Sequence, residues 1–244
     1  MIHHQKSEAP RCWAILPAAG AGRRMGERIA KQYLQLAGHP VIHWAMQPLL
    51  VEPRVSGLVV VLAQGDRNWP GYSPASSDKL FLTAQGGSER YQSVRNGLQA
   101  LREHADNNDW VLVHDAVRPC LPAGDLDCLL GRLWEDEVGG LLAVPVRDTM
   151  KEEGVDTDAC RVARTVPRVR MWLALTPQMF RYGLLCDALD QAIASGLEIT
   201  DEAAAIEHAG YSPRLVEGHS ANLKITFPQD LLLAEALLAQ EAGA

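Results

Sequence analysis

Residues 16 to 26 have the types and spacing that phosphate chemistry requires. The segment reads LPAAGAGRRMG, and Gly20 and Gly22 let backbone amides approach a polyphosphate without an intervening side chain. Three fixed positive charges follow, namely Arg23, Arg24 and Lys31. A loop that only holds a cofactor seldom needs so many cations. We therefore infer that they neutralise charge during a reaction.

Two familiar glycine motifs fit this segment poorly. The third glycine, Gly26, comes one residue later than the dinucleotide-binding fingerprint GxGxxG requires, and residues 40 to 46 contain no acid for a ribose. These departures weaken the hypothesis of a nicotinamide oxidoreductase. The spacing also differs from the GxxxxGK of a Walker loop, which argues against an NTPase of that type. A tight strand-to-helix turn with a solvated basic face is the structural alternative.

Composition is that of an ordinary globular protein. The chain has 244 residues, of which 47% are hydrophobic and 22% charged, and we predict one α/β domain over residues 1–244. A net charge of -7 argues against nucleic acid as a partner. No segment resembles a signal peptide or a membrane span, so we expect a cytoplasmic protein. The five scattered cysteines indicate reduced packing residues.

Apolar runs alternate with stretches of helical spacing along most of the chain. The runs lie at 13–16, 58–62, 80–82, 110–114 and 141–146, and the helical stretches at 41–50, 88–103 and 125–134. This order predicts a Rossmann-like, mainly parallel sheet with helices on both faces. Ligands of such sheets lie beyond the carboxyl ends of the strands, which is where the glycine turn, Asp115 and Arg118 would fall.

The pattern changes at 147–168, which we interpret as a protruding two-stranded arm. It has too few large apolar residues for a core of its own, and an isolated ribbon is marginal in water. We expect it to pack on a second subunit in a homodimer, with a flexible surface hairpin as the alternative. After it, the sequence predicts a helix at 177–194, a helix capped by Thr200, a strand at 214–216 and a helix from Pro228.

Several polar residues could serve a site at the sheet edge. Asp115 could hold magnesium, accept a substrate hydroxyl or pair with Arg118. We expect His114 to be a packed strand-end residue rather than a general base. Paired glycines before the helix at 88–103 could form a slot for a flat base, and Arg90 could brace that loop or face solvent. More distant residues that could complete a cationic funnel are Arg147, Thr149, Arg164, Arg168, Thr176, Thr200 and Lys224.

Eight segments taken together point to one family. They are PAAGAGRRM, KQY from Lys31, GGSER with Ser93, HDAVRPC, PVRDTMK, ALTPQ, TDEA, and VEG followed by NLKIT. In this order and over this length the set resembles 2-C-methyl-D-erythritol 4-phosphate cytidylyltransferase of the non-mevalonate isoprenoid pathway. The resemblance implies a homodimer that joins CTP to a sugar-alcohol phosphate and releases pyrophosphate, with magnesium.

The resemblance also implies a role for each matched residue. The catalytic cations would be Arg24, Lys31, Lys224 and Arg168, the last reaching from the partner subunit. The nucleotide side would consist of Pro17, Ala18, Ala19, Gly20, Ala21, Gly22, Gly87 and Ser93. The substrate side would consist of Asp115, Arg118, Thr149 and Thr200, with Asp115 as the candidate magnesium ligand.

Two positions depart from the family pattern. Ser88 stands where some members carry an aspartate near the cytosine, so backbone groups would have to read the base. Pro167 replaces an acidic residue, and because proline fixes its φ angle and restricts the preceding residue, it changes how Arg168 is presented.

Charge neutralisation is the main demand of this reaction. A phosphate monoester has a second pKa of about 6, so the attacking oxygen is already ionised and needs no base. Each pair of unit charges 4 Å apart repels by about 4 kcal/mol at an effective dielectric constant near 20.

Two further alternatives are a cytidylyltransferase for another polyol phosphate, such as ribitol 5-phosphate, and a silent CTP-binding regulator.

Overall fold

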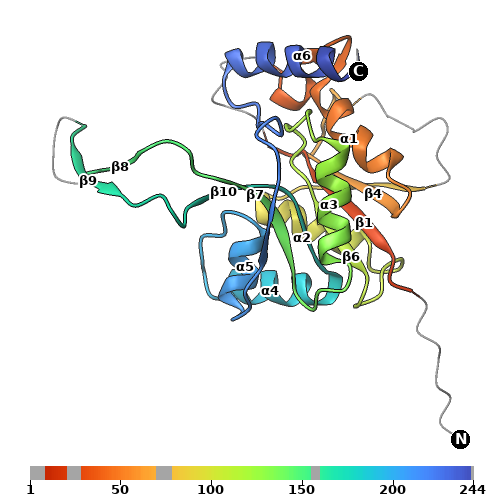
Figure 1. Cartoon of the computed structure of the whole chain (residues 1–244). Coiled ribbons are helices and arrows are strands. Elements are labelled where there is room, and N and C mark those ends of the chain that lie inside the picture. Colours follow the sequence, from red (N-terminus) through yellow and green to blue (C-terminus); the bar gives the residue numbers. More distant parts are fainter. Residues whose placement is uncertain (1–8, 21–28, 70–78, 155–159, 243–244) are drawn as a thin grey trace, which may run out of the picture.

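A seven-stranded sheet forms the centre of the structure, a computed structural model that describes residues 9–20, 29–69, 79–154 and 160–242 (Figure 1). The strand order is β11-β7-β10-β6-β1-β4-β5. These strands are β1 (Cys12–Pro17), β4 (Val55–Leu62), β5 (Leu80–Gln85), β6 (Trp110–Val113), β7 (Gly139–Pro145), β10 (Trp172–Arg181) and β11 (Arg214–Glu217). Every neighbouring pair is parallel except those of β10, which runs antiparallel to β6 and β7. The predicted mainly parallel sheet is confirmed.

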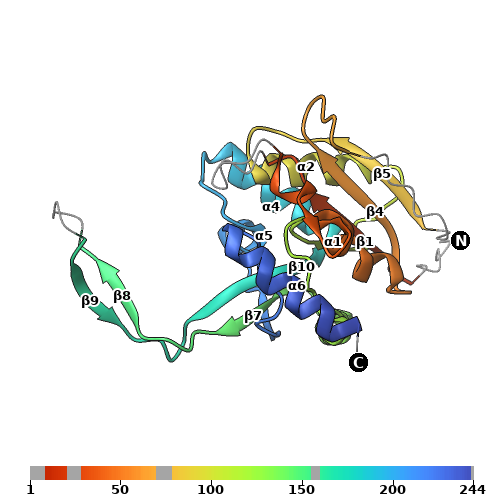
Figure 2. The same cartoon turned by 90° about the horizontal axis from the view of Figure 1, so that it is seen from above.

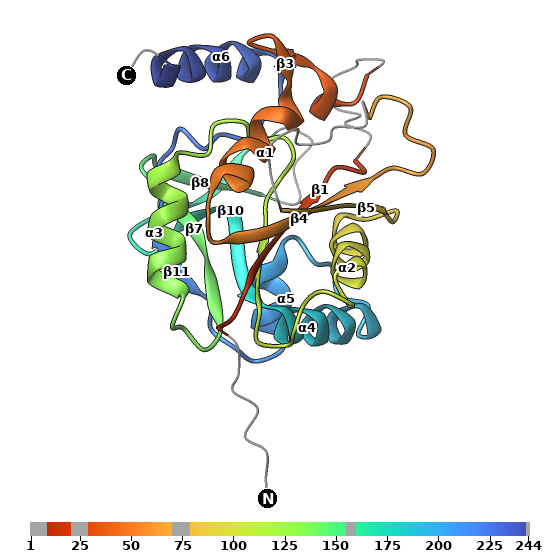
Figure 3. The same cartoon turned by 90° about the vertical axis from the view of Figure 1, so that its right-hand side faces the viewer.

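Helices cover both faces of this sheet, because side chains along a strand alternate between its faces. On β1, Ala14 and Leu16 enter one hydrophobic core, whereas Trp13 and Ile15 enter the other. The first core holds α1 (Val41–Val51) and α3 (Ala123–Leu133), and the second holds α2 (Arg90–Ala100), α4 (Tyr182–Ala194) and α5 (Glu202–His208). Figure 3 shows the two helical layers on either side of the sheet. No helix of the described residues is long and apolar enough to cross a lipid bilayer.

A third, smaller core joins the C-terminal helix to a hairpin beside the sheet. The C-terminal helix α6 (Pro228–Ala242) packs on a two-stranded hairpin of β2 (Gln35–Leu36) and β3 (His39–Pro40). Leu36, Ile225 and Ala234 are buried together there. The short 3-10 helix η2 (Lys31–Tyr33) lies just before this hairpin. This core therefore ties the turn that carries Lys31 to the segment that carries Lys224.

The predicted arm is a two-stranded antiparallel ribbon of β8 (Met150–Glu153) and β9 (Val162–Val166). It projects away from the body of the molecule (Figure 2). Apolar side chains are exposed along it and the adjoining strand, and Val169 and Leu173 are 93% and 55% exposed. Homodimerisation through this arm stays a prediction, as does the single domain over residues 1–244.

Two expected helix starts are wrong. The helix expected from residue 177 begins only at Tyr182, because β10 continues to Arg181. Pro177 has no amide hydrogen to donate, and the β10–β7 pairing shifts register between Ala174 and Gln178, so the strand accommodates it. The N-cap of α5 is Asp201 and not Thr200, because the Asp201 carboxylate accepts the amide of Ala204 at 2.9 Å. A carboxylate also complements the positive end of the helix dipole.

Candidate active site

A cleft of about 790 Å³ opens at the carboxyl ends of β1, β5 and β6. Nine residues predicted for the site line it, namely Pro17, Ala18, Ala19, Gly20, Lys31, Gly87, Ser93, Asp115 and Lys224. They come from the turn after β1, the loop before α2, the loop after β6 and the segment before α6. The fold thus brings together residues that are far apart in the sequence.

The turn after β1 is held in place by Gln32, a residue that the sequence analysis did not single out for a role. Its side chain is buried, and its Nε2 donates to the carbonyl of Ala18 at 2.6 Å and to that of Gly20 at 3.3 Å. The amide of Ala18 donates to Val61 at 2.8 Å. The predicted residues Ala21, Gly22 and Arg24 lie outside the described residues.

The loop before α2 forms the opposite wall. The hydroxyl of Ser93 accepts the amide of Gly87 at 3.2 Å and donates to the carbonyl of Glu89 at 3.2 Å. Gln92 Oε1 accepts the amides of Ser88 at 2.9 Å and Glu89 at 3.2 Å, so that α2 starts with a capping box. These contacts fix the loop before any ligand enters. They also engage the Ser88 hydroxyl, which donates to Gln92 Oε1 at 2.9 Å.

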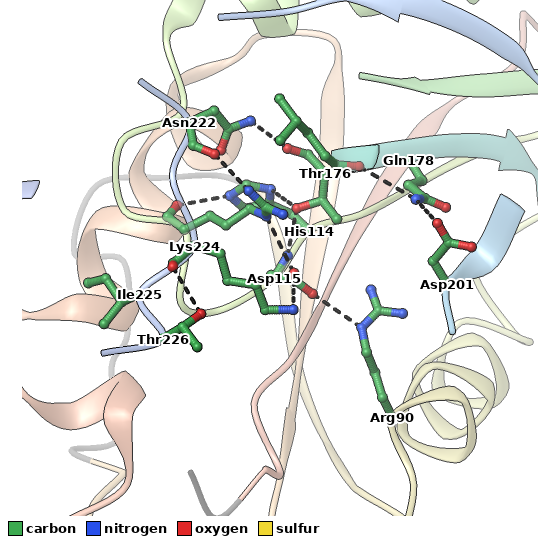
Figure 4. A network of polar contacts seen from close by, with 12 residues as sticks. Arg90, His114, Asp115, Thr176, Gln178, Asp201, Asn222, Lys224, Ile225 and Thr226 are labelled. Carbon is green, nitrogen blue, oxygen red and sulfur yellow. Dashed lines mark hydrogen bonds and ion pairs between the residues drawn. The ribbon is translucent and has the colours of Figure 1, made fainter. Parts of the chain in front are cut away.

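Asp115 lies at the centre of a network of positive charges (Figure 4). Its carboxylate contacts Lys224 Nζ at 2.9 Å, Arg90 Nε at 3.2 Å and Arg118 Nε at 3.4 Å. Burial raises the pKa of Asp115, but attraction to Arg90, Lys224 and Arg118 outweighs it, so the pKa lies far below its ordinary value. Asp115 is therefore ionised at neutral pH, and its pairing with Arg118 is observed.

Arg90 lines the cleft and contacts two carboxylates, those of Asp115 and Glu202, so it does not merely face solvent. Its guanidinium binds the buried carboxylate of Glu202 in a bidentate pair, at 2.6 and 3.0 Å. Burial lowers the pKa of Arg90, but Glu202 and Asp115 raise it above its ordinary value. This pair joins α2 to α5 at the wall of the cleft. The carboxylate of Glu202 is a partner that the sequence analysis did not foresee.

His114 is a packed residue, as predicted. Its ring is fully buried, with Nδ1 2.9 Å from Thr176 Oγ1 and Nε2 3.2 Å from the carbonyl oxygen of Arg118. Burial is the largest cause that lowers the pKa of His114, to about 4. The ring is therefore neutral at pH 7 and does not face the cleft.

Four predicted residues do not line this cleft. Arg118 is buried behind it and donates to the carbonyl of Asn222 at 2.7 Å. Thr149 and Arg168 are exposed at the arm, and Thr200 is exposed before α5. For these residues the structure of one chain leaves the predicted contacts to substrate untested.

Two carboxylate residues line the cleft, Glu89 and Asp115, and the side chain of Glu89 already caps α2. The residues that the structure describes contain no group of three or more His, Cys, Asp or Glu side chains that could hold a metal ion. Asp115 lines the cleft beside Lys224, but both of its oxygens already accept from cations. Magnesium is commonly bound by one or two carboxylates together with substrate phosphates, and this donor set fits only that type of site.

The fold and the cleft are those of a nucleotidyltransferase, because a glycine-containing turn and two converging lysines share one edge of a mainly parallel sheet. Comparison with known proteins identifies the family. A family model described as 2-C-methyl-D-erythritol 4-phosphate cytidylyltransferase matches residues 12–240. The chain belongs to this family, which confirms the predicted cytidylyltransferase over the oxidoreductase alternative.

Relatives of that name cover almost the full chain. One from Pseudomonas aeruginosa is 54% identical over 227 residues, which are 93% of this chain and 95% of that protein. One from Nitrosospira multiformis is 51% identical over 229 residues, 93% of this chain and 97% of that protein. A solved 4-diphosphocytidyl-2C-methyl-D-erythritol synthase is 34% identical with a TM-score of 0.79, over 95% of this chain and all of that one. A solved 2-C-methyl-D-erythritol 4-phosphate cytidylyltransferase from Francisella tularensis is 32% identical with a TM-score of 0.78, over 93% of this chain and 99% of that one.

Proposed function

We propose that this chain transfers the cytidylyl group of CTP to 2-C-methyl-D-erythritol 4-phosphate in isoprenoid-precursor synthesis. An oxygen of the acceptor phosphate attacks the α-phosphorus of CTP. The bond from that phosphorus to the oxygen bridging to the β-phosphate breaks, and pyrophosphate leaves. The convergence of Lys31 and Lys224 on one cleft, from segments 193 residues apart (224 minus 31), is the observation that carries the proposal.

The cytidine is expected to lie between the turn after β1 and the loop before α2. Both walls are built from backbone groups that side chains hold in position, by Gln32 on one side and by Gln92 with Ser93 on the other. A site fixed before binding loses little entropy when the nucleotide enters. Backbone donors and acceptors are therefore proposed to read the base, with Ser88 in a lesser role.

Lys31 and Lys224 are proposed to act on the phosphates from two sides. Lys31 Nζ donates to the carbonyl of Ile225 at 3.0 Å, and Lys224 Nζ lies 2.9 Å from Asp115 Oδ2. Each ammonium is thus held in place while its charge faces the cleft. Fixed cations stabilise the charge that accumulates as the two phosphates approach, without reorganisation of solvent.

Magnesium is proposed to enter with the triphosphate, with Asp115 as its one protein carboxylate. The ion would supply further positive charge to the phosphate oxygens. Arg24 is proposed to add a cation from the glycine turn. A cytoplasmic location stays a prediction.

The second substrate is proposed to lie between two subunits. Arg168 and Thr149 belong to the exposed arm and not to the cleft of their own chain. A dimer in which each arm reaches the neighbouring cleft would bring them to the acceptor phosphate. Obligate dimers commonly build sites from both subunits, and exposed apolar residues such as Val169 favour such packing.

Pyrophosphate release with defined acceptors tests the activity. We expect turnover with CTP and 2-C-methyl-D-erythritol 4-phosphate, and little with ribitol 5-phosphate or with ATP. Turnover with ribitol 5-phosphate alone would replace the proposed acceptor. Binding of CTP without release of pyrophosphate in the presence of either acceptor would support the silent regulator instead.

A further inference from the structure

The segment 222–226 connects both lysines of the cleft without being part of a helix or strand. Lys224 projects from it to Asp115, while the carbonyl of Ile225 accepts from Lys31 and its amide donates to Val117 at 2.9 Å. Figure 4 shows this segment passing beside the loop that carries His114 and Asp115. Because no backbone ladder holds these residues, their position depends on individual contacts.

Asn222 makes the contacts that attach the start of this segment to the sheet. Its side-chain Nδ2 donates to the carbonyl of Thr176 on β10 at 2.7 Å, and its own backbone carbonyl accepts Arg118 Nη1 at 2.7 Å. The residue is fully buried, so it cannot touch a reactant in the cleft. One asparagine thus joins the segment of Lys224 to β10 and to the loop after β6.

The side-chain oxygen of Asn222 is buried and has no hydrogen-bond partner among the described residues. A buried acceptor left unpaired costs roughly 1–3 kcal/mol, so an apolar side chain of similar shape would serve core stability better. The amide orientation is fixed nonetheless, since a rotated amide would place two acceptors, Oδ1 and the Thr176 carbonyl, against each other. Among the described residues, the contribution of this side-chain amide is therefore the hydrogen bond that its Nδ2 donates to the carbonyl of Thr176.

We propose that Asn222 is a positioning residue for Lys224. Its bond to Thr176 fixes where the segment leaves the sheet, two residues before Lys224, and thereby keeps the Lys224 ammonium beside Asp115 and in front of the nucleotide phosphates. The inference rests on the proposed role of Lys224 in the reaction. A buried amide that touches no reactant thus helps to position a cation of the cleft.

A double-mutant cycle of Asn222→Ala and Lys224→Ala tests this coupling. We expect Asn222→Ala to lower kcat by about ten- to a hundredfold, since displacing a catalytic group by 1 Å can have an effect of that size. In the Lys224→Ala chain the same substitution should change kcat less than twofold, because there is no ammonium left to position. Asn222→Leu, which matches the shape without the amide, should behave like Asn222→Ala.

Asp109→Asn serves as the matched control. Asp109 is also buried and accepts from the amide of Arg11 and from Trp13 Nε1, both at 2.9 Å, but at the opposite end of the sheet. The Asp109→Asn substitution should lower the free energy of unfolding and leave kcat unchanged. Equal losses of kcat from Asn222→Ala in both backgrounds, no loss at all, or failure of both Asn222 variants to fold would overturn the proposal. Unchanged turnover of Lys224→Ala alone would instead contradict the proposed role of Lys224.

Discussion

Asp115 organises an excess of positive charge. Three cations, Arg90, Arg118 and Lys224, contact it, and Glu202 is the one further carboxylate that pairs with any of them among the described ion pairs. Three positive charges thus face two negative ones at the end of the cleft, and Lys31 adds a fourth cation nearby. In a protein with a net charge of -7 we expect this local surplus to attract a triphosphate.

Removal of one of these cations should affect turnover far more than folding. For Lys31→Ala we expect kcat to fall roughly a hundredfold to a thousandfold, as when one well-placed oxyanion donor is lost. Steady-state pyrophosphate release measures the effect. Lys79→Ala is the matched control, because the Lys79 ammonium also donates to backbone carbonyls, of Leu49 and Glu52, but does not line the cleft. Equal effects of the two substitutions would contradict the role of Lys31.

Burial of His114 should make stability depend on pH. Its pKa falls from 6.5 to about 4 on folding, so the unfolded chain takes up a proton that the folded chain does not. The contribution to stability is complete above pH 6.5 and declines as the pH falls toward 4. Between pH 7.5 and 5 the free energy of unfolding should decrease by about 2 kcal/mol from this residue. Urea unfolding of the native chain and of His114→Gln at both pH values should show a smaller decrease in the variant, and equal decreases would contradict the assignment.

Individual site residues could be predicted where a local motif marks them, and not where their partners are distant. Gly20, Lys31, Asp115 and Ser93 belong to short motifs and line the cleft as expected. The support from Gln32 and from Asn222 depends on contacts across the fold, the latter with a partner 46 residues away. Sequence spacing carries no signal for such pairs.

At the scale of elements, the loop between β5 and α2 is shaped by close backbone approach. A Cβ atom on Gly86 would lie 2.9 Å from Ser93 Oγ and would also collide with Ala19 Cβ on the opposite wall. We expect Gly86→Ala to raise the KM for CTP about tenfold, since overpacking of this kind costs roughly 1–3 kcal/mol. Gly131→Ala on α3, where a Cβ meets nothing within 4 Å, should leave the KM unchanged. Equal KM values for the native chain, Gly86→Ala and Gly131→Ala would show that the two walls of the cleft can move apart to admit the added methyl group.

The alternation of apolar and helical segments predicted the parallel strands and the helices on both faces, because that periodicity follows directly from burial. It failed at β10, where a proline within an apolar stretch was interpreted as a helix start. Only pairing with β6 and β7 makes the stretch a strand, and both partners are distant in the sequence. The cap of α5 failed by one residue for a related reason, since Thr200 and Asp201 are both suitable cap types.

At the scale of the whole molecule, a heterodimer tests whether the arm completes the neighbouring site. One subunit would carry Lys31→Ala and the other Arg168→Ala, and two different tags would allow the mixed dimer to be purified. If Arg168 acts across the interface, both defects fall on one site, and about half of the native activity should remain per dimer. Homodimers of either variant are the controls and should be nearly inactive.

An inactive mixed dimer would show that Arg168 serves its own subunit. Light scattering must accompany the assay, because a chain that remains monomeric at assay concentration would contradict shared sites altogether. Removal of residues 148–166 offers an independent test, since loss of the ribbon should yield monomers. An unchanged dimer would refute its role in assembly.

Strand β10 leaves the arm at Trp172, contributes Thr176 beneath the cleft, places Phe180 in a hydrophobic core and ends at Arg181. If the arm joins two subunits as proposed, ten consecutive residues serve assembly, support of the site and folding at once. A substitution in this strand that changes one of these properties would therefore tend to change the other two. A ligand bound at the outer end of this strand would then alter the reaction from a distance.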